Sequence, residues 1–198
     1  MATVLACAAL ALGVARTAMF VALHLVPSDY DIVHHAVSDY AVGPTRRLAA
    51  AMTWTSAVFW LALAAAVALA PANGGPGLAV WMLALAVVFA LLPLLPTDVE
   101  GSAPTLVGRF HMLAAIAWFT IAYSCMGGFI RFFAPSAPGG LMVLLVAVSW
   151  VAAVGLVALV PALVVRPLRR VAFGISERVF LLAVHVFYIA VAVGLVLV

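Results

Sequence analysis

Six long hydrophobic segments constrain this sequence more than any other feature. They cover residues 3–26, 48–70, 78–95, 105–133, 140–165 and 178–198. Each is long enough for an α-helix to cross the hydrocarbon core of a bilayer, about 30 Å thick. Hydrophobic residues make up 69% of the chain and charged residues only 8%, whereas soluble domains carry about 25% charged residues. This pattern excludes a soluble globular protein, a disordered chain and a nucleic-acid-binding protein.

The segments predict an all-α polytopic membrane protein. Clusters of Pro and Gly at residues 71–77 and 135–140 indicate tight turns, so the helices on either side of each turn should be antiparallel neighbours. We expect a single domain over residues 1–198, built as a bundle of six transmembrane helices with a short interfacial helix after the first.

The charged residues are concentrated on one side of the predicted bundle. All six acidic residues and seven of the nine basic residues, each an Arg, lie in the first, third and fifth loops or at the adjoining helix ends. Because Arg near span ends favours the cytoplasm, we expect these odd-numbered loops to be cytoplasmic. The protein would lie in the cell's inner membrane with both termini outside. The acidic residues on the same side predict a polar site there.

The first loop, residues 27–43, has the pattern of a short amphipathic helix at the membrane interface. At about 100° per residue its apolar and polar side chains separate onto opposite arcs. The apolar arc holds Ile32, Val33, Ala36, Val37 and Tyr40, and the polar arc holds Asp31, His34, His35 and Ser38. The polar arc faces either water or the helix bundle, and Asp39 at the boundary of the arcs is placed to point inward.

The third loop combines acidic residues with a helix-borne His. Asp98 and Glu100 lie in a turn, and Thr105 is a suitable N-cap for the helix that follows. Arg109 and His111 lie in the first two turns of that helix. An acidic turn beside such a His favours acid–base catalysis or metal binding. The alternative is a capped helix with a local Asp98–Arg109 ion pair.

The sixth segment begins with ionisable residues. Ser176 is a suitable N-cap, and Glu177 suits the first turn of a helix. Arg178 and His185 are seven residues apart and so share nearly the same helix face. This face is a second source of polar groups for a site between the helices.

Arg16 lies in the middle of the first segment. A charge at this depth is unfavourable in lipid, so the side chain should face the bundle and have a partner. Asp39, Asp98 and Glu177 are the candidate partners. Arg16 is then either half of a structural ion pair or a ligand-binding or catalytic residue.

Three stretches together resemble a known family. They are Val37-Ser-Asp-Tyr, the stretch from Leu95-Pro-Thr-Asp-Val-Glu-Gly to Gly108-Arg-Phe-His-Met-Leu-Ala-Ala115, and Gly174-Ile-Ser-Glu-Arg-Val179. The chain resembles, over nearly its whole length, the prokaryotic membrane-protein family catalogued as domain of unknown function 998. This resemblance implies about six membrane helices and no established reaction. By motif position it singles out Ser38, Asp39, Pro96, Asp98, Gly108, Arg109, His111, Glu177 and Arg178.

A weaker similarity is to the ceramidase-like intramembrane hydrolases, which use Ser, Asp and several His around zinc. Those enzymes carry two His four residues apart on the last helix, whereas Leu181 and Ile189 stand four residues from His185 here. Zinc needs three or four ligands, and no spacing selects His34, His35 and His111 as a set. We therefore expect no metal cofactor, with zinc as the alternative.

Three functions fit these observations. The first is a multi-pass membrane protein of uncharacterised function with a cytoplasmic-side pocket for a lipid headgroup or another small molecule. The second is a lipid-directed hydrolase or transferase, and the third a proton-coupled transporter. The candidate catalytic residues are Ser38, Asp39, Asp98 and His111. The candidate ligand-binding residues are Arg16, Arg109, Glu177, Arg178 and His185.

Overall fold

The computed structural model describes residues 1–70, 75–99 and 102–197, and within these residues every regular element is a helix. The α-helices are α1 (Ala2–Leu25), α2 (Arg46–Ala68), α3 (Gly75–Leu91), α4 (Leu106–Phe133), α5 (Gly139–Val164) and α6 (Arg166–Leu197). The loops hold short 3-10 helices, η1 (Val37–Ala41), η2 (Gly43–Thr45) and η3 (Leu92–Leu94). In the described part of the chain, six helices are long and apolar enough to cross a membrane. The predicted all-α fold with six spans is confirmed.

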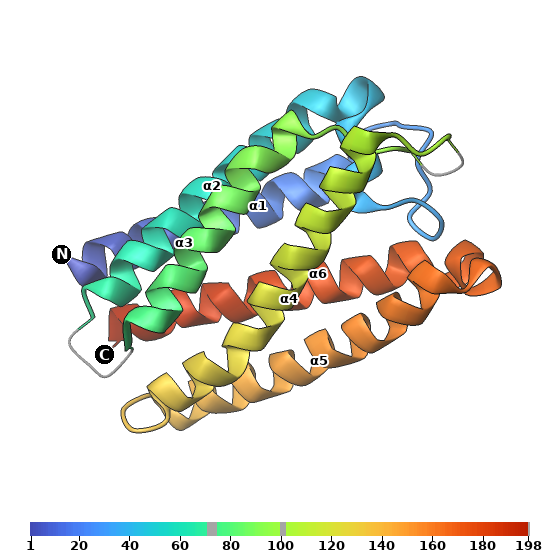
Figure 1. The fold of residues 1–198 in the computed structure, drawn as a ribbon. Coiled ribbons are helices and arrows are strands. Elements are labelled where there is room, and N and C mark those ends of the chain that lie inside the picture. Colours follow the sequence, from blue (N-terminus) through green and yellow to red (C-terminus); the bar gives the residue numbers. More distant parts are fainter. Residues whose placement is uncertain (71–74, 100–101, 198) are drawn as a thin grey trace.

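Helix α4 bridges two packed groups of helices (Figure 1). In one group α1, α2 and α3 lie side by side, and in the other α5 and α6 form an antiparallel pair. Helix α6 also packs along α1, while α4 crosses obliquely and makes smaller interfaces with α3, α5 and α6. The α1–α2, α3–α4 and α5–α6 connections share one end of the bundle, which we call the loop end.

Aromatic side chains from three helices fill the bundle interior. Trp60 of α2 and Tyr188 of α6 pack edge to face with ring centres 4.6 Å apart, and Phe129 of α4 also packs on Tyr188. The Tyr188 hydroxyl donates to the Ala122 carbonyl oxygen over 2.7 Å. These contacts join α4 to α6 away from the loop end.

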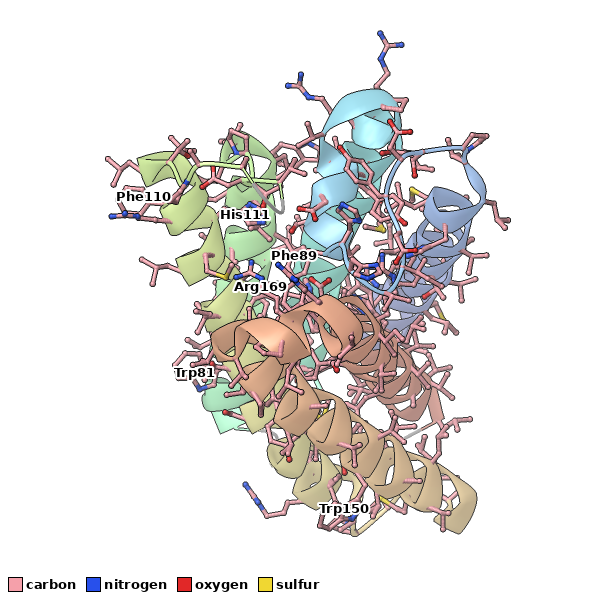
Figure 2. All side chains as sticks on the ribbon, turned by 90° about the vertical axis from the view of Figure 1, so that its right-hand side faces the viewer. Trp81, Phe89, Phe110, His111, Trp150 and Arg169 are labelled. Atoms are coloured by element: carbon pink, nitrogen blue, oxygen red, sulfur yellow. The ribbon has the colours of Figure 1, made fainter. Side chains whose placement is uncertain are left out.

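The outer surface of the bundle is apolar, as expected for helices that face lipid. On α5, Trp150, Val154 and Val157 are all exposed. Trp81 and Phe110, which are also exposed, lie with Trp150 at the periphery of the bundle in Figure 2.

Helix α6 begins well before residue 178, where we had predicted its start. Pro167 is compatible with the first turn of a helix. Gly174 leaves room for the first loop, because a Cβ at this position would lie 2.5 Å from the Ile32 carbonyl oxygen. Ser176 is therefore buried inside α6 rather than an N-cap, and Glu177 is not in the first turn. Both of those predictions were wrong.

The short helix predicted in the first loop is the 3-10 helix η1 rather than an amphipathic α-helix. Asp31 Oδ1 accepts hydrogen bonds from the backbone N–H groups of Val33 and His34, at 2.7 and 3.1 Å. Asp39 Oδ2 accepts one from the Ala36 N–H at 3.1 Å. Side-chain bonds of this kind compete with the α-helical backbone pattern. The resulting loop places η1 against α2 and α6.

Candidate functional site

A cavity of about 570 Å³ opens at the loop end of the bundle. Its walls come from α2, α3, α4 and α6, with η1 and η3 at the mouth and Arg16 of α1 farther in. Ligand sites in proteins typically measure about 300–1,000 Å³. Viewed from the loop end, Figure 2 shows Phe89 of α3 and His111 of α4 near the middle of the bundle. The cavity is therefore of a suitable size and position for a ligand.

One wall of the cavity is polar. Ser38, Thr97, His111 and Glu177 line it, and the same residues line a smaller cavity of about 50 Å³. The smaller cavity adds Asp39, Asp98 and Arg169. Polar residues from η1, the third loop, α4 and α6 thus meet in one place.

Another part of the cavity lining is aromatic and aliphatic. Phe89 and Trp118 pack with ring centres 5.1 Å apart, and Trp118 packs edge to face on Phe119 at 4.4 Å. Leu181 of α6 completes this wall. A ligand in the cavity would meet both polar groups and apolar rings.

Arg16 does not form the ion pair that we predicted. Its side chain is 3% exposed, and its Nε donates to Ser56 Oγ at 3.0 Å. Within residues 1–70, 75–99 and 102–197, no carboxylate lies within ion-pair distance of Arg16, and Nη1 has no hydrogen-bond partner. The candidate partners lie elsewhere, because Asp98 and Glu177 accept from backbone groups and Asp39 lines the smaller cavity.

His185 lies beneath the cavity and does not line it. It is 1% exposed, and Nδ1 bonds to the Leu181 carbonyl oxygen. Its Nε2 and the Trp60 Nε1 have no hydrogen-bond partner in the part of the chain that the structure describes. Because a carbonyl only accepts hydrogen bonds, Nδ1 must carry the proton in this contact.

Glu177 reaches the cavity wall from α6. It is 7% exposed, and Oε2 accepts from the Val37 N–H at 2.7 Å. This bond attaches the start of η1 to α6 and so positions Ser38 on the same wall.

Arg178 points away from the cavity and joins three parts of the chain. Its Nε donates to His24 Nε2 at 2.9 Å, and Nη1 donates to the carbonyl oxygens of His35 at 2.8 Å and Gly174 at 2.9 Å. The guanidinium carbon lies 5.6 Å from the centre of the Tyr40 ring. Arg178 therefore fastens the first loop to α1 and α6.

Asp98 organises the start of α4. It accepts from the backbone N–H and the hydroxyl of Thr105, both at 2.7 Å, and Thr105 Oγ1 accepts from the Gly108 N–H at 3.0 Å. The backbone bond and then the hydroxyl bond from Thr105 lower the pKa of Asp98. Thr105 is the predicted N-cap, but the alternative Asp98–Arg109 ion pair does not form, because Arg109 is exposed and not bound to Asp98.

His111 faces the cavity in a defined orientation. Its Nδ1 lies 2.7 Å from the Leu95 carbonyl oxygen and must donate to it. In the neutral ring Nε2 is then an acceptor. His111 therefore presents a basic nitrogen from a fixed position on the wall.

His34 and His35 lie outside both cavities. His34 is exposed and bonds Asp31 at 2.8 Å, and this contact, followed by the Val33 N–H, lowers the pKa of Asp31. His35 Nδ1 accepts from the Asp31 N–H at 3.0 Å. The described residues contain no group of three or more His, Cys, Asp or Glu that could hold a metal ion. The zinc alternative stays a prediction.

Over residues 5–194 the chain matches the family described as "Protein of unknown function (DUF998)". The chain belongs to the DUF998 family. This membership confirms the resemblance carried by the three stretches and, together with the six apolar helices, identifies a multi-pass membrane protein. Neither the curated proteins nor the solved structures contain a match.

The structure of this DUF998 protein brings some predicted site residues together and separates others. Those that line one or both cavities are Arg16, Ser38, Asp39, Asp98, His111 and Glu177. Those that line neither are His34, His35, Arg109, Arg178 and His185. The roles assigned to each residue stay predictions.

Sequence reasoning missed three residues of this DUF998 site. Thr97 lies between Pro96 and Asp98, so the family-like stretch contained a signal for it. Ser56, which holds Arg16, and Trp118, which forms the apolar wall, carried no comparable signal. In the sequence each looks like any other residue of a transmembrane helix, and its role becomes visible only when the packing of the neighbouring helices is known.

Proposed function

We propose that this protein binds a membrane lipid or a related amphiphile, with the polar group of the ligand in the 570 Å³ cavity. The observation that carries the proposal is the mixed polar and apolar lining. Ser38, Thr97, His111 and Glu177 offer hydrogen bonds, while Phe89 and the rings beside it offer an apolar surface. A headgroup with the first part of its chains needs such surroundings.

We also propose that the cavity opens toward the cytoplasm from the inner membrane. Seven of the nine Arg lie in the odd-numbered loops or at the adjoining helix ends, and Arg near the ends of membrane spans favours the cytoplasmic side. A C-terminal reporter that works only outside the cytoplasm should then be active. Activity from a reporter that works only inside the cytoplasm would contradict this orientation.

Filling the cavity tests the proposed function. Ala115 lines both cavities, whereas Ala114, its neighbour on the same helix, lines neither. In purified, detergent-solubilised protein, we expect Ala115→Phe to weaken the binding of dihexanoyl phospholipids at least about tenfold. Ala114→Phe should leave it unchanged. Fluorescence of Trp118 on the cavity wall gives the readout, and equal affinities for both variants would refute the proposed site.

A second candidate function is a lipid-directed hydrolase or transferase, with His111 as the general base. The observation that favours it is the orientation of His111, whose Nδ1 donates to the Leu95 carbonyl and whose Nε2 is an acceptor when the ring is neutral. We expect a His111→Ala variant that folds and binds lipid to lose release of fatty acid from lipid vesicles. Absence of any release by the wild-type protein would eliminate this candidate.

A further inference from the structure

Arg16 is a buried cation that has no carboxylate within ion-pair distance among the residues that the structure describes. Its side chain is 3% exposed in the middle of α1, and it lines the cavity. Its Nη1 has no hydrogen-bond partner among the described residues. An uncompensated charge inside a membrane bundle is strongly unfavourable. This arrangement indicates a partner that comes from outside the chain.

The Arg16 guanidinium is held in one orientation. Its Nε donates to Ser56 Oγ at 3.0 Å, and the Ser56 hydroxyl in turn donates to the Met52 carbonyl oxygen at 2.8 Å. The Phe20 ring centre lies 5.9 Å from the guanidinium carbon. One edge of the group is therefore occupied, while Nη1 is buried without a partner among the described residues and the Arg16 side chain lines the cavity. A planar guanidinium with free N–H groups matches the oxygen atoms of phosphate and carboxylate groups.

The described residues that line the 570 Å³ cavity include two basic side chains and one acidic one. Arg16 and Arg46 are the basic residues, and Glu177 accepts from the Val37 N–H, while Asp39, Asp98 and Arg169 line the smaller cavity beside it. His185 is near enough to Arg16 to interact with it electrostatically. This ring is either neutral or positive, so it supplies no negative charge in either protonation state.

We propose that the ligand of this cavity is anionic and that Arg16 binds its phosphate or carboxylate group. The apolar part of the ligand lies against Phe89 and Trp118. The inference rests on the proposed function and adds the charge class of the ligand and the residue that selects it. An anionic lipid headgroup and a free small anion share this chemistry, so the experiment includes both.

The test compares two probes that differ only in the phosphate group. Dihexanoyl phosphatidic acid and dihexanoylglycerol carry the same chains, and inorganic phosphate serves as the free anion. In detergent-solubilised wild-type protein, we expect phosphatidic acid to bind at least about tenfold more tightly than dihexanoylglycerol. Arg16→Gln should abolish this preference. Arg131→Gln should retain it, because Arg131 lines neither cavity.

Each outcome decides one claim. If both dihexanoyl lipids bind equally and Ala115→Phe weakens both, the anionic ligand is wrong and the proposed function stands. If neither binds in a way that Ala115→Phe affects, the proposed function fails as well. If inorganic phosphate binds as tightly as phosphatidic acid and depends on Arg16, the anion site stands and the lipid proposal fails.

A measurement on the wild-type protein covers the case in which Arg16→Gln does not fold. A ligand that binds only the native state raises the Tm. Phosphatidic acid should raise the Tm more than dihexanoylglycerol does at equal concentration. Equal Tm shifts for both probes would overturn the inference without any variant.

Discussion

Two buried arginines of this bundle differ in how many hydrogen bonds they make. Arg178 donates to His24 and to two backbone carbonyls and lies against the Tyr40 ring. Arg16 donates to the Ser56 hydroxyl alone, and among the described residues each arginine leaves one buried nitrogen without a partner, Nη1 of Arg16 and Nη2 of Arg178. Both side chains are at least nine-tenths buried. The same residue type therefore fastens a loop through three hydrogen bonds at one position, and at the other makes one hydrogen bond and lines the cavity.

The difference follows from which elements surround each arginine. Arg178 lies where the first loop folds back onto α6, so the His35 carbonyl of the loop is close to it, in addition to the Gly174 carbonyl one turn earlier in α6. Arg16 lies between apolar helices whose carbonyls are used in their own helical hydrogen bonds. We infer that a buried arginine in a membrane bundle stabilises the fold where the backbone of a loop lies against it. Where helices surround it, the arginine is a candidate for binding a ligand.

The largest effect should come from Arg178→Met. This change removes the Arg178 donor from His24 Nε2 and from the His35 carbonyl oxygen, and each buried unsatisfied group costs about 1–3 kcal/mol. We expect the free energy of unfolding in detergent micelles to fall by about 3 kcal/mol. Arg170→Met on the exposed start of α6 is the control, with a change within about 0.5 kcal/mol. Similar values for both variants would mean that Arg178 does not fasten the loop.

Gly174→Ala should give the next largest effect in the same region. Its Cβ would lie 2.5 to 2.8 Å from the carbonyl oxygens of Ile32, Val33 and His35. We expect unfolding to require about 2 kcal/mol less than in the wild type, as for other overpacked sites. Gly127→Ala in α4 meets only the end of Arg131, at 3.5 Å. That control should be neutral, and equal destabilisation of both would show that the loop does not pack on Gly174.

Arg16→Met should have a smaller effect and the opposite sign. Replacing a buried charge that lacks a counter-charge by an apolar side chain removes a desolvation penalty. Without ligand, we expect the free energy of unfolding to stay the same or rise by about 1 kcal/mol. A loss as large as that of Arg178→Met would show that Arg16 has a structural role, and the contrast between the two arginines would disappear.

Asp98→Asn should have the smallest effect, because Asp98 is well bonded but open to solvent. Its pKa is lowered in the folded state, so its contribution is complete above the ordinary Asp pKa of about 3.9. That contribution is lost as the pH falls through the lower folded-state pKa. The Tm difference between wild type and variant should therefore shrink from about pH 6 to about pH 3. A difference that does not change with pH would show that the carboxylate charge plays no part.

The six helices were predictable because run length alone decides whether a helix can cross a bilayer. The start of α6 was not predictable from the sequence. Gly174 looks like a helix break there, whereas in the structure it lies within α6 because the carbonyls of the first loop pack against it. The conformation of the first loop depends on local hydrogen bonds from backbone N–H groups to the Asp31 and Asp39 carboxylates. The periodicity of apolar residues does not predict these bonds.

The candidate site was predictable as a set of residues but not as a cavity. Ser38, His111 and Glu177 were selected by type and by position in the family-like stretches, and all three reach one wall. Their convergence depends on the oblique path of α4, which no spacing in the sequence specifies. For Arg16, sequence reasoning correctly placed a buried charge but predicted a carboxylate partner that the structure does not provide.

The most direct test of the account is an experimental structure of the protein with dihexanoyl phosphatidic acid. We expect a phosphate oxygen within about 2.7–2.9 Å of a nitrogen of the Arg16 guanidinium, with the acyl chains against Phe89 and Trp118. A phosphate bound elsewhere without contact to Arg16, or a carboxylate of the chain paired with Arg16, would contradict the proposal.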